Sequence, residues 1–321
     1  MAALPFELAG RRVYVAGDRG MVGSAIVRRL AREDCEVLTT PRSLDLREQA
    51  AVRAWFAAER PEAVFLAAAR VGGIAANDAH PAQFLYDNLM IQANVIESAR
   101  ASGVAKLLFL GSSCIYPRNA DQPLTEDALL TGPLEPTNQW YAIAKIAGIK
   151  LCDAYRREHG CDFISAMPTN LYGPGDNYDP ATSHVLPALI AKVHAAKVAG
   201  ADSIAVWGSG TPLREFLHVD DLADACVLLM REFTGEGPVN VGSGQEVTIA
   251  HLAELVCTAA GFEGAIHFDP SKPDGTPRKL LDSSRLAGLG WAPRIALAEG
   301  IAAELRTYAE GANVRRVRLD G

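Results

Sequence analysis

The stretch RVYVAGDRGMVGSAIVRRL, residues 12–30, decides the fold. It opens with a short apolar run, passes through Gly17, Gly20 and Gly23, and ends with apolar residues at helical spacing. A strand, a glycine-rich turn and a helix in this order are typical of a dinucleotide site, since glycines let the backbone approach a pyrophosphate at the helix N-terminus. An ordinary glycine-rich turn is the alternative, but this position favours a phosphate-binding turn, which would also include Met21 and Val22.

The alternation of strand and helix continues along the chain. Short apolar runs predict strands, and longer segments with helical periodicity predict helices, at residues 36–40, 50–59, 63–69, 84–103, 106–113 and 138–160 in turn. Residues 162–173 would form the next strand and the loop that leaves its end. This order predicts an α/β protein with a Rossmann doubly wound parallel sheet. The C-terminal third mixes short strands and helices and predicts a smaller α/β substrate-binding cap. We assign residues 1–175 mainly to the nucleotide-binding domain and 176–321 mainly to the cap, with some chain crossing between them.

The amino-acid composition argues for some classes of function and against others. The chain has 321 residues, 49% of them hydrophobic and 21% charged, which is typical of a globular enzyme. Its net charge of −7 argues against nucleic acid as a partner. No apolar run reaches the roughly 18 residues of a membrane span, and we expect a cytoplasmic protein. The cysteines have no paired spacing, so we expect buried thiols and no metal; they are Cys35, Cys114, Cys152, Cys161, Cys226 and Cys257.

The end of the second predicted strand indicates which dinucleotide is bound. An NAD site usually has a carboxylate there, about 20 residues after the glycines, to hold the ribose 2′-hydroxyl. This chain instead has Pro41 and Arg42, and Arg19 lies within the glycine turn. Arginines in place of the carboxylate favour a 2′-phosphate, and therefore NADP(H), although either arginine could be an ordinary surface charge. Asp45 is a candidate contact for the adenine amine, and Leu46 adjoins it.

Tyr141 and Lys145 are candidate catalytic residues. They stand four residues apart and share one face of a helix. A nearby ammonium group and the nicotinamide charge would favour the phenolate and make the phenol a better proton donor and acceptor. Ser112, at the end of a strand, would hydrogen-bond the same substrate oxygen, although the adjacent Ser113 is an alternative. The alternative explanation for the YxxxK spacing is a pair of exposed residues on a helix without a catalytic role.

Cys114 and His184 are residues that carbonyl reduction alone would not need. Cys114 lies in the same turn as Ser112, and His184 lies in a long loop that would cross the substrate. A thiol and an imidazole can move protons on carbons beside a ketone, because the carbonyl acidifies those C–H bonds. A buried thiol and an ordinary loop histidine are the alternatives.

The chain closely resembles the GDP-L-fucose synthases of the extended short-chain dehydrogenase/reductase family, from residue 13 to about 291. The most specific matching stretches are KLLFLGSSCIYP (106–117) and SHVLPALI (183–190). The others are AGDRGMVGSAIVRRL (16–30), LAAARVGGIAAN (66–77), EPTNQWYAIAKIAGIKLCDAY (135–155), MPTNLYGPGDNY (167–178), VWGSGTPLREFLHVDDLA (206–223) and SKPDGTPRKLLD (271–282). The family has an arginine at the position of Pro41 and a lysine at the position of Arg70.

The resemblance implies a reaction and its residues. GDP-4-keto-6-deoxy-D-mannose would be epimerised at C3 and C5 and then reduced at C4 by NADPH to give GDP-L-fucose. Cys114 would be the base and His184 the acid, and Ser112, Tyr141 and Lys145 the reductase triad. The implied substrate contacts are Lys192, Trp207, Arg214, Asp274 and Lys279. The implied cofactor contacts are Leu110, Gly111, Ser112, Ser113, Tyr141, Lys145, Pro168, Thr169, Asn170, Leu171 and His184.

Two other functions compete with this interpretation. A sugar-nucleotide 4,6-dehydratase or 4-epimerase of the same fold would recycle a bound NAD, but such dehydratases have Thr-Asp-Glu where this chain has Ser112, Ser113 and Cys114. A non-catalytic NADP-sensing protein would commonly lack the tyrosine or the lysine. We also expect a homodimer, because helices near 84–100 and 136–158 carry apolar faces that related enzymes pair into a four-helix interface.

Overall fold

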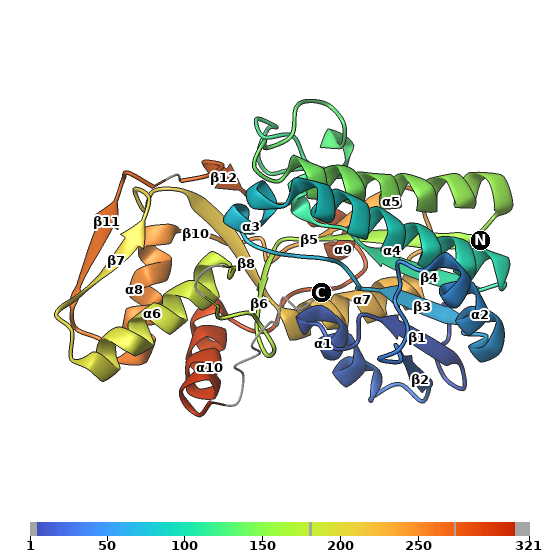
Figure 1. Ribbon diagram of the computed structural model, residues 1–321, viewed down its shortest axis with the longest axis horizontal. Coiled ribbons are helices and arrows are strands. Elements are labelled where there is room, and N and C mark those ends of the chain that lie inside the picture. The colour runs from blue at the N-terminus through green and yellow to red at the C-terminus, as the bar shows by residue number, and fades with distance from the viewer. Residues whose placement is uncertain (1–4, 180–181, 273, 312–321) are drawn as a thin grey trace.

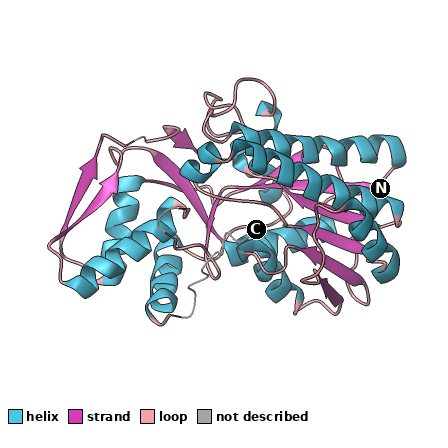
Figure 2. Cartoon of the chain, viewed as in Figure 1, coloured by secondary structure: helices cyan, strands magenta, loops and turns pink. Residues whose placement is uncertain are grey.

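The computed structural model describes residues 5–179, 182–272 and 274–311, and these form two lobes (Figure 1). The larger lobe is built on one parallel sheet with helices on both faces (Figure 2). Its strand order is β2-β1-β3-β4-β5-β9. The strands are β1 (Arg12–Ala16), β2 (Glu36–Thr39), β3 (Ala63–Leu66), β4 (Lys106–Leu110), β5 (Asp162–Pro168) and β9 (Pro238–Val241). The predicted doubly wound Rossmann sheet is confirmed.

Each strand of this sheet supplies two separate cores. Side chains alternate between the faces of a strand, so Val13 and Val15 enter one core while Tyr14 enters the other. On the first face, α1 (Met21–Leu30) packs against α7 (Val219–Glu232). The second face carries α2 (Gln49–Glu59), α4 (Pro81–Ala101) and α5 (Gln139–His159). Because helices cover both faces, β3 and β4 are buried along their whole length.

The smaller lobe covers the carboxyl edge of the main sheet. Its strands form two groups, one around β8 and the other a parallel pair, β7 with β11. The strands are β6 (Asn170–Tyr172), β7 (Ser203–Trp207), β8 (Leu213–His218), β10 (Glu246–Thr248), β11 (Ala265–Asp269) and β12 (Arg278–Lys279). The helices that pack in its core are α6 (Val185–Ala199), α8 (Ile249–Ala260) and α10 (Leu297–Ala309). The short helices of the chain are α3 (Ile74–Ala79), η1 (Ser113–Ile115), η2 (Glu126–Ala128) and α9 (Ser284–Ala287).

The chain crosses more than once between the lobes. After β8 it returns to the larger lobe, where α7 covers one face of the sheet and β9 adds the sixth strand beside β5. Part of the C-terminal third, which was predicted to form the cap, therefore belongs to the main sheet. The division at residue 175 stays a prediction. Among the described residues, no helix is long and apolar enough to cross a membrane, and no cluster of three or more His, Cys, Asp or Glu side chains is arranged to hold a metal ion.

Glu215 joins elements from three parts of the chain. Its side chain, on β8, is fully buried. One carboxylate oxygen accepts a hydrogen bond from the Gly244 N–H at 2.7 Å, and the other accepts one from the Leu281 N–H at 3.1 Å. Burial raises the pKa of Glu215, and these backbone N–H groups oppose that shift by hydrogen-bonding the carboxylate. The carboxylate therefore fastens the loop after β9 and the segment after β12 to β8.

Glu215→Gln is expected to destabilise the fold. The amide has one acceptor oxygen where the carboxylate has two, so its NH₂ group must face a buried backbone N–H and one charge-assisted bond is lost. The expected cost is about 1.5–3 kcal/mol. Denaturant unfolding measures it as a lower midpoint at unchanged slope. An unchanged midpoint would show that these two bonds contribute little.

Candidate functional site

The glycine turn is built for close approach to a phosphate. Gly17 has φ +88°, and a Cβ there would lie 2.7 Å from the backbone of Ala68, just beyond β3. A Cβ on Gly23 would lie only 2.0 Å from the Gly17 carbonyl oxygen. Gly20 precedes the first turn of α1, and no side chain caps that helix. The turn therefore leaves the first N–H groups of α1 for an anion, which fits a dinucleotide pyrophosphate.

Gly23→Ala is expected to weaken dinucleotide binding at least about tenfold, or 1.4 kcal/mol. The new methyl group can be accommodated only if α1 moves away from the glycine turn. Gly20→Ala is a matched control, because its Cβ would meet the same Gly17 oxygen at 3.3 Å and demands a much smaller shift. Titration calorimetry of both variants with NADPH makes the comparison. Equal affinities in the two variants would contradict the steric argument.

The predicted adenosine contacts lie around the end of β2. The Thr40 N–H donates to Asp18 Oδ1 at 3.0 Å, which fastens this end of β2 to the glycine turn. Arg19 and Arg42 are both exposed, and the described part of the chain contains no ion pair to either. Asp45 instead forms an ion pair with Arg47 at 2.7 Å. The two arginines are available for a 2′-phosphate, whereas an adenine amine would share Asp45 with an arginine.

The turn after β4 brings Ser112 and Cys114 together. Ser112 caps η1, and the Cys114 N–H lies 3.4 Å from its hydroxyl oxygen. Cys114 Sγ lies 3.1 Å from the same oxygen, and the cysteine side chain is only 9% exposed. Ser113 is buried. This arrangement favours Ser112 over Ser113 as the hydroxyl that works beside the thiol.

Tyr141 and Lys145 lie on α5, facing this turn. Lys145 is buried, and its Nζ donates to the Leu110 carbonyl at 2.7 Å. Its Nζ lies 5.7 Å from the centre of the Tyr141 ring. Burial lowers the pKa of Lys145 to about 8, against the raising influence of Cys114.

The surroundings of Tyr141 bear on its role as a proton donor. Burial, and to a smaller extent Cys114, raises the pKa of Tyr141. A raised pKa favours the phenol, the form that can donate a proton. The expectation that Lys145 and the nicotinamide charge together favour the phenolate stays a prediction.

His184 immediately precedes α6, in the smaller lobe. The residue is exposed, unlike Cys114. Desolvation by the surrounding protein lowers the pKa of His184, and the charge of Lys279 adds to this. The preceding loop is tied to both lobes, since Tyr178 donates to Glu304 on α10 at 2.9 Å and the Gly73 N–H donates to the Thr182 carbonyl at 3.1 Å. These contacts fix the loop at Tyr178 and at Thr182, two residues before His184.

The predicted substrate contacts all lie in the smaller lobe. Arg214 on β8 contacts the Asp274 carbonyl at 3.4 Å, and the Asp274 carboxylate accepts from the Ser209 N–H at 2.7 Å. Trp207 is 64% exposed at the end of β7. Lys192 donates to the Ala205 carbonyl on the same strand. Asp274 thus has a structural role in closing a turn. The exposed Trp207 ring has Lys272 Nζ 5.5 Å from its centre, and its aromatic face suits a planar ligand.

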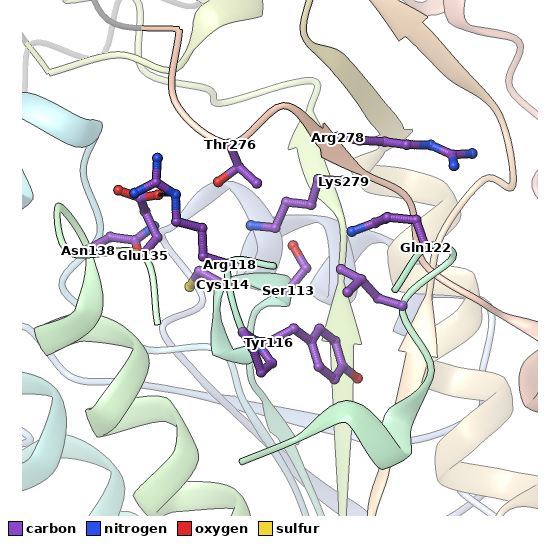
Figure 3. Close-up of a pocket in the computed structure, with 12 residues that line it drawn as sticks. Ser113, Cys114, Tyr116, Arg118, Gln122, Glu135, Asn138, Thr276, Arg278 and Lys279 are labelled. Atoms are coloured by element: carbon purple, nitrogen blue, oxygen red, sulfur yellow. Dashed lines mark ion pairs between the residues drawn. The ribbon is translucent and has the colours of Figure 1, made fainter. Parts of the chain in front are cut away.

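Lys279 and Cys114 line one small pocket, with about 30 Å³ open to the centres of water molecules (Figure 3). Its lining also includes Arg118, Glu135 and Asn138. The sequence analysis missed Glu135 and Asn138. Their signal was their position, directly before Tyr141 in the segment EPTNQWY. The remaining predicted cofactor contacts, residues 168–171, follow β5 at the same edge of the sheet; Pro168 and Thr169 are buried, while Asn170 and Leu171 are half-buried.

The chain is similar to known proteins over most of its length. Residues 13–242 match the NAD dependent epimerase/dehydratase family. The chain is 58% identical over 304 residues to a GDP-L-fucose synthase of Sinorhizobium fredii, covering 94% of this chain and 97% of that one. It is 62% identical over 292 residues to GDP-L-fucose synthase 1 of Arabidopsis thaliana, covering 90% of each. A GDP-L-fucose synthetase structure from Naegleria fowleri bound to NADP superposes with a TM-score of 0.89 at 27% identity, covering 98% of this chain and 99% of that one.

Proposed function

Since this chain belongs to the GDP-L-fucose synthases of the NAD dependent epimerase/dehydratase family, we propose that it converts GDP-4-keto-6-deoxy-D-mannose to GDP-L-fucose. The enzyme is an NADP(H)-dependent epimerase and reductase. One observation carries the assignment of residues, namely the 3.1 Å contact between Cys114 Sγ and Ser112 Oγ. It puts a base for the carbons beside a ketone next to a hydroxyl that can bind the ketone oxygen.

In the epimerisation, Cys114 removes the protons at C3 and C5. The C4 carbonyl makes these protons acidic, and Ser112 with Tyr141 stabilises the negative charge that moves onto its oxygen. His184 returns a proton from the opposite face, which inverts the carbon. The lowered pKa of His184 makes its protonated form a stronger acid.

In the reduction, bound NADPH supplies a hydride to C4. The phenol of Tyr141 donates a proton to the ketone oxygen, and its raised pKa keeps it protonated until the alkoxide forms. Lys145, held by the Leu110 carbonyl, stabilises the phenolate that remains. Ser112 positions the oxygen for both transfers.

The pH dependence of the reduction should report Lys145. With a pKa of about 8, its stabilising charge is present below pH 8 and is lost as the pH rises through that value. We expect kcat/KM for NADPH oxidation to fall above pH 8. Lys145→Arg, which keeps its charge, should remove this alkaline limb even if the rate is lower. The same limb in both proteins would mean that another group titrates.

The basic and aromatic residues near the site suit the phosphates of NADPH and the GDP part of the substrate. We assign the 2′-phosphate of NADPH to Arg19 and Arg42, which are exposed beside the glycine turn. The GDP diphosphate would contact Lys192, Arg214 and Lys279, and Trp207 would pack against a planar part of the nucleotide. Asp274 would contact a hydroxyl group while holding its turn.

A homodimer through α4 and α5 is also part of the proposal. These helices pack against each other, and Tyr86, Trp140 and Ile143 lie exposed on them. An apolar surface of this kind on two adjacent helices suits a four-helix interface. Gel filtration at the mass of one chain would contradict a dimer. A cytoplasmic location stays a prediction.

The decisive experiment follows NADPH absorbance after addition of GDP-4-keto-6-deoxy-D-mannose, with NMR of the sugar product. GDP-L-fucose formed with one NADPH per sugar supports the proposal. Sugar conversion without NADPH consumption would indicate a redox-neutral epimerase instead. No conversion at all would be the result expected of an NADP-sensing protein.

A further inference from the structure

The two inversions create a problem of proton balance. In each inversion, a C–H bond breaks as Cys114 gains a proton, and a new C–H bond forms as His184 loses one. After the first carbon is inverted, Cys114 is a thiol and His184 is neutral. The second inversion needs the thiolate and the protonated imidazole again. One proton must therefore leave Cys114, and one must reach His184, while the sugar stays bound.

The two residues differ in their access to solvent. His184 has an exposed side chain and can take a proton from water in the cleft. Cys114 is buried, and a sugar bound against Ser112 and Tyr141 covers it further. A separate route from the thiol to solvent is therefore required.

The pocket beside Cys114 provides such a route. Cys114, Glu135 and Asn138 all line it, and its volume of about 30 Å³ open to the centres of water molecules admits about two of them. Arg118 forms an ion pair of 3.2 Å with Glu135 Oε2 (Figure 3), and its side chain is 46% exposed whereas that of Glu135 is 18% exposed. The pocket thus runs from a buried thiol, past a carboxylate, to a group in contact with solvent.

Two polar atoms of this pocket are incompletely satisfied. Glu135 Oε2 and Asn138 Oδ1 are buried and accept no hydrogen bond from the described residues. The ion pair to Arg118 lacks the geometry of a hydrogen bond, and Thr137 reaches only the other carboxylate oxygen, at 3.4 Å. Buried acceptors of this kind usually bind ordered water. Both residues line the same polar pocket, which gives ordered water a place to connect them.

We propose that Glu135 is a proton relay that returns Cys114 to the thiolate between the two inversions. This inference rests on the proposed function. The S–H bond breaks, its electron pair stays on sulfur, and the proton passes through water to a Glu135 oxygen. The carboxylic acid then gives the proton to water beside Arg118, while His184 takes one from the cleft. The protonation of the enzyme is restored with no change in total charge.

The charges that face Glu135 support the relay. Lys279 on β12 interacts electrostatically with both Cys114 and Glu135, and Arg118 faces the carboxylate from the loop after η1. These two cations stabilise an anion at either end of the route, so a proton can move between thiolate and carboxylate without leaving an unpaired negative charge. Burial lowers the pKa of Lys279, and the negative groups beside it oppose that shift.

The test counts deuterons in a single turnover. Enzyme in excess is mixed with GDP-4-keto-6-deoxy-D-mannose and NADPH in D₂O, and the sugar is analysed by NMR at C3 and C5 over time. The wild-type product should carry two deuterons. Glu135→Gln should incorporate the first at the wild-type rate and the second about 10- to 100-fold more slowly. Singly inverted, reduced sugar should accumulate.

Chemical rescue separates a relay from a structural role. Added acetate, a diffusible proton acceptor, should restore the second deuteron in Glu135→Gln and leave the wild type unchanged. Glu135→Asp should restore it without acetate, because the carboxylate is kept. Arg118→Lys is the matched control, since it changes the geometry of the same ion pair but keeps the cation beside the carboxylate, and it should still give two deuterons and no acetate response.

The outcomes also distinguish the relay from the function on which it rests. A second deuteron at the wild-type rate in Glu135→Gln would overturn the relay, and so would a slow second deuteron that acetate does not accelerate. If Arg118→Lys reproduced the defect, the geometry of the ion pair would be the cause. Wild-type enzyme that incorporates no deuterium and oxidises no NADPH would instead refute the proposed function.

Discussion

Replacing Cys114 with serine is expected to remove inversion at C3 and C5 while leaving C4 reduction possible. An alcohol in this turn is a far weaker base than a thiolate, so the epimerisation rate should fall about 10²- to 10⁴-fold. Ser112, Tyr141 and Lys145 are untouched, and the reduction needs only these residues and bound NADPH. The variant should therefore slowly reduce the ketosugar without inverting it.

NMR of the product made in D₂O measures both parts of this prediction. The variant sugar should keep its original configuration and carry no deuterium at C3 or C5. Cys161→Ser is a suitable control, because Cys161 is half-buried at the start of β5, whereas the reaction site lies beyond the carboxyl ends of the strands. GDP-L-fucose formed at the normal rate by Cys114→Ser would remove this residue from the mechanism.

Replacing Tyr141 with phenylalanine should suppress C4 reduction while leaving proton exchange at C3 and C5 possible. The ring still fills its place on α5, but no phenol donates the proton that completes C4 reduction. NADPH oxidation should fall about 10²- to 10⁴-fold. Cys114 and His184 remain, so solvent deuterium should still enter C3 or C5.

Two assays on the same variant test this separation. Absorbance follows NADPH, and NMR in D₂O without NADPH follows exchange. Loss of NADPH oxidation with continued exchange would show that Tyr141 serves mainly the reduction. Loss of both would mean that the tyrosine is also needed to stabilise the charge on the ketone oxygen during epimerisation. Undiminished NADPH oxidation would contradict its role as proton donor.

Local sequence predicted the parts of the molecule that depend on neighbouring residues. The glycine turn was recognisable because Gly17 and Gly23 are required by close backbone approaches within one strand-turn-helix unit. Tyr141 and Lys145 were recognisable because four residues on a helix bring side chains to one face. The parallel sheet followed from alternating strand and helix patterns, which are themselves local.

Other features required the tertiary structure. Glu135 and Asn138 look like ordinary loop residues until the fold places them in one pocket with Cys114 and Lys279. The surroundings of Tyr141 also required the structure, since spacing revealed the nearby lysine but neither the burial of the phenol nor the Leu110 carbonyl that Lys145 contacts. Burial depends on every element that packs around a group.

The sequence by itself determined the fold class, the dinucleotide turn and the set of candidate catalytic side chains, because hydrophobic periodicity, glycine geometry and residue chemistry are encoded over short spans. Only the tertiary structure decided how that set is arranged. It brought Cys114 to Ser112 at 3.1 Å, buried the thiol while leaving His184 exposed, and surrounded the site with Lys279 and Glu135 from other segments. Solvent access and electrostatic environment depend on contacts between distant segments, and local spacing does not contain them.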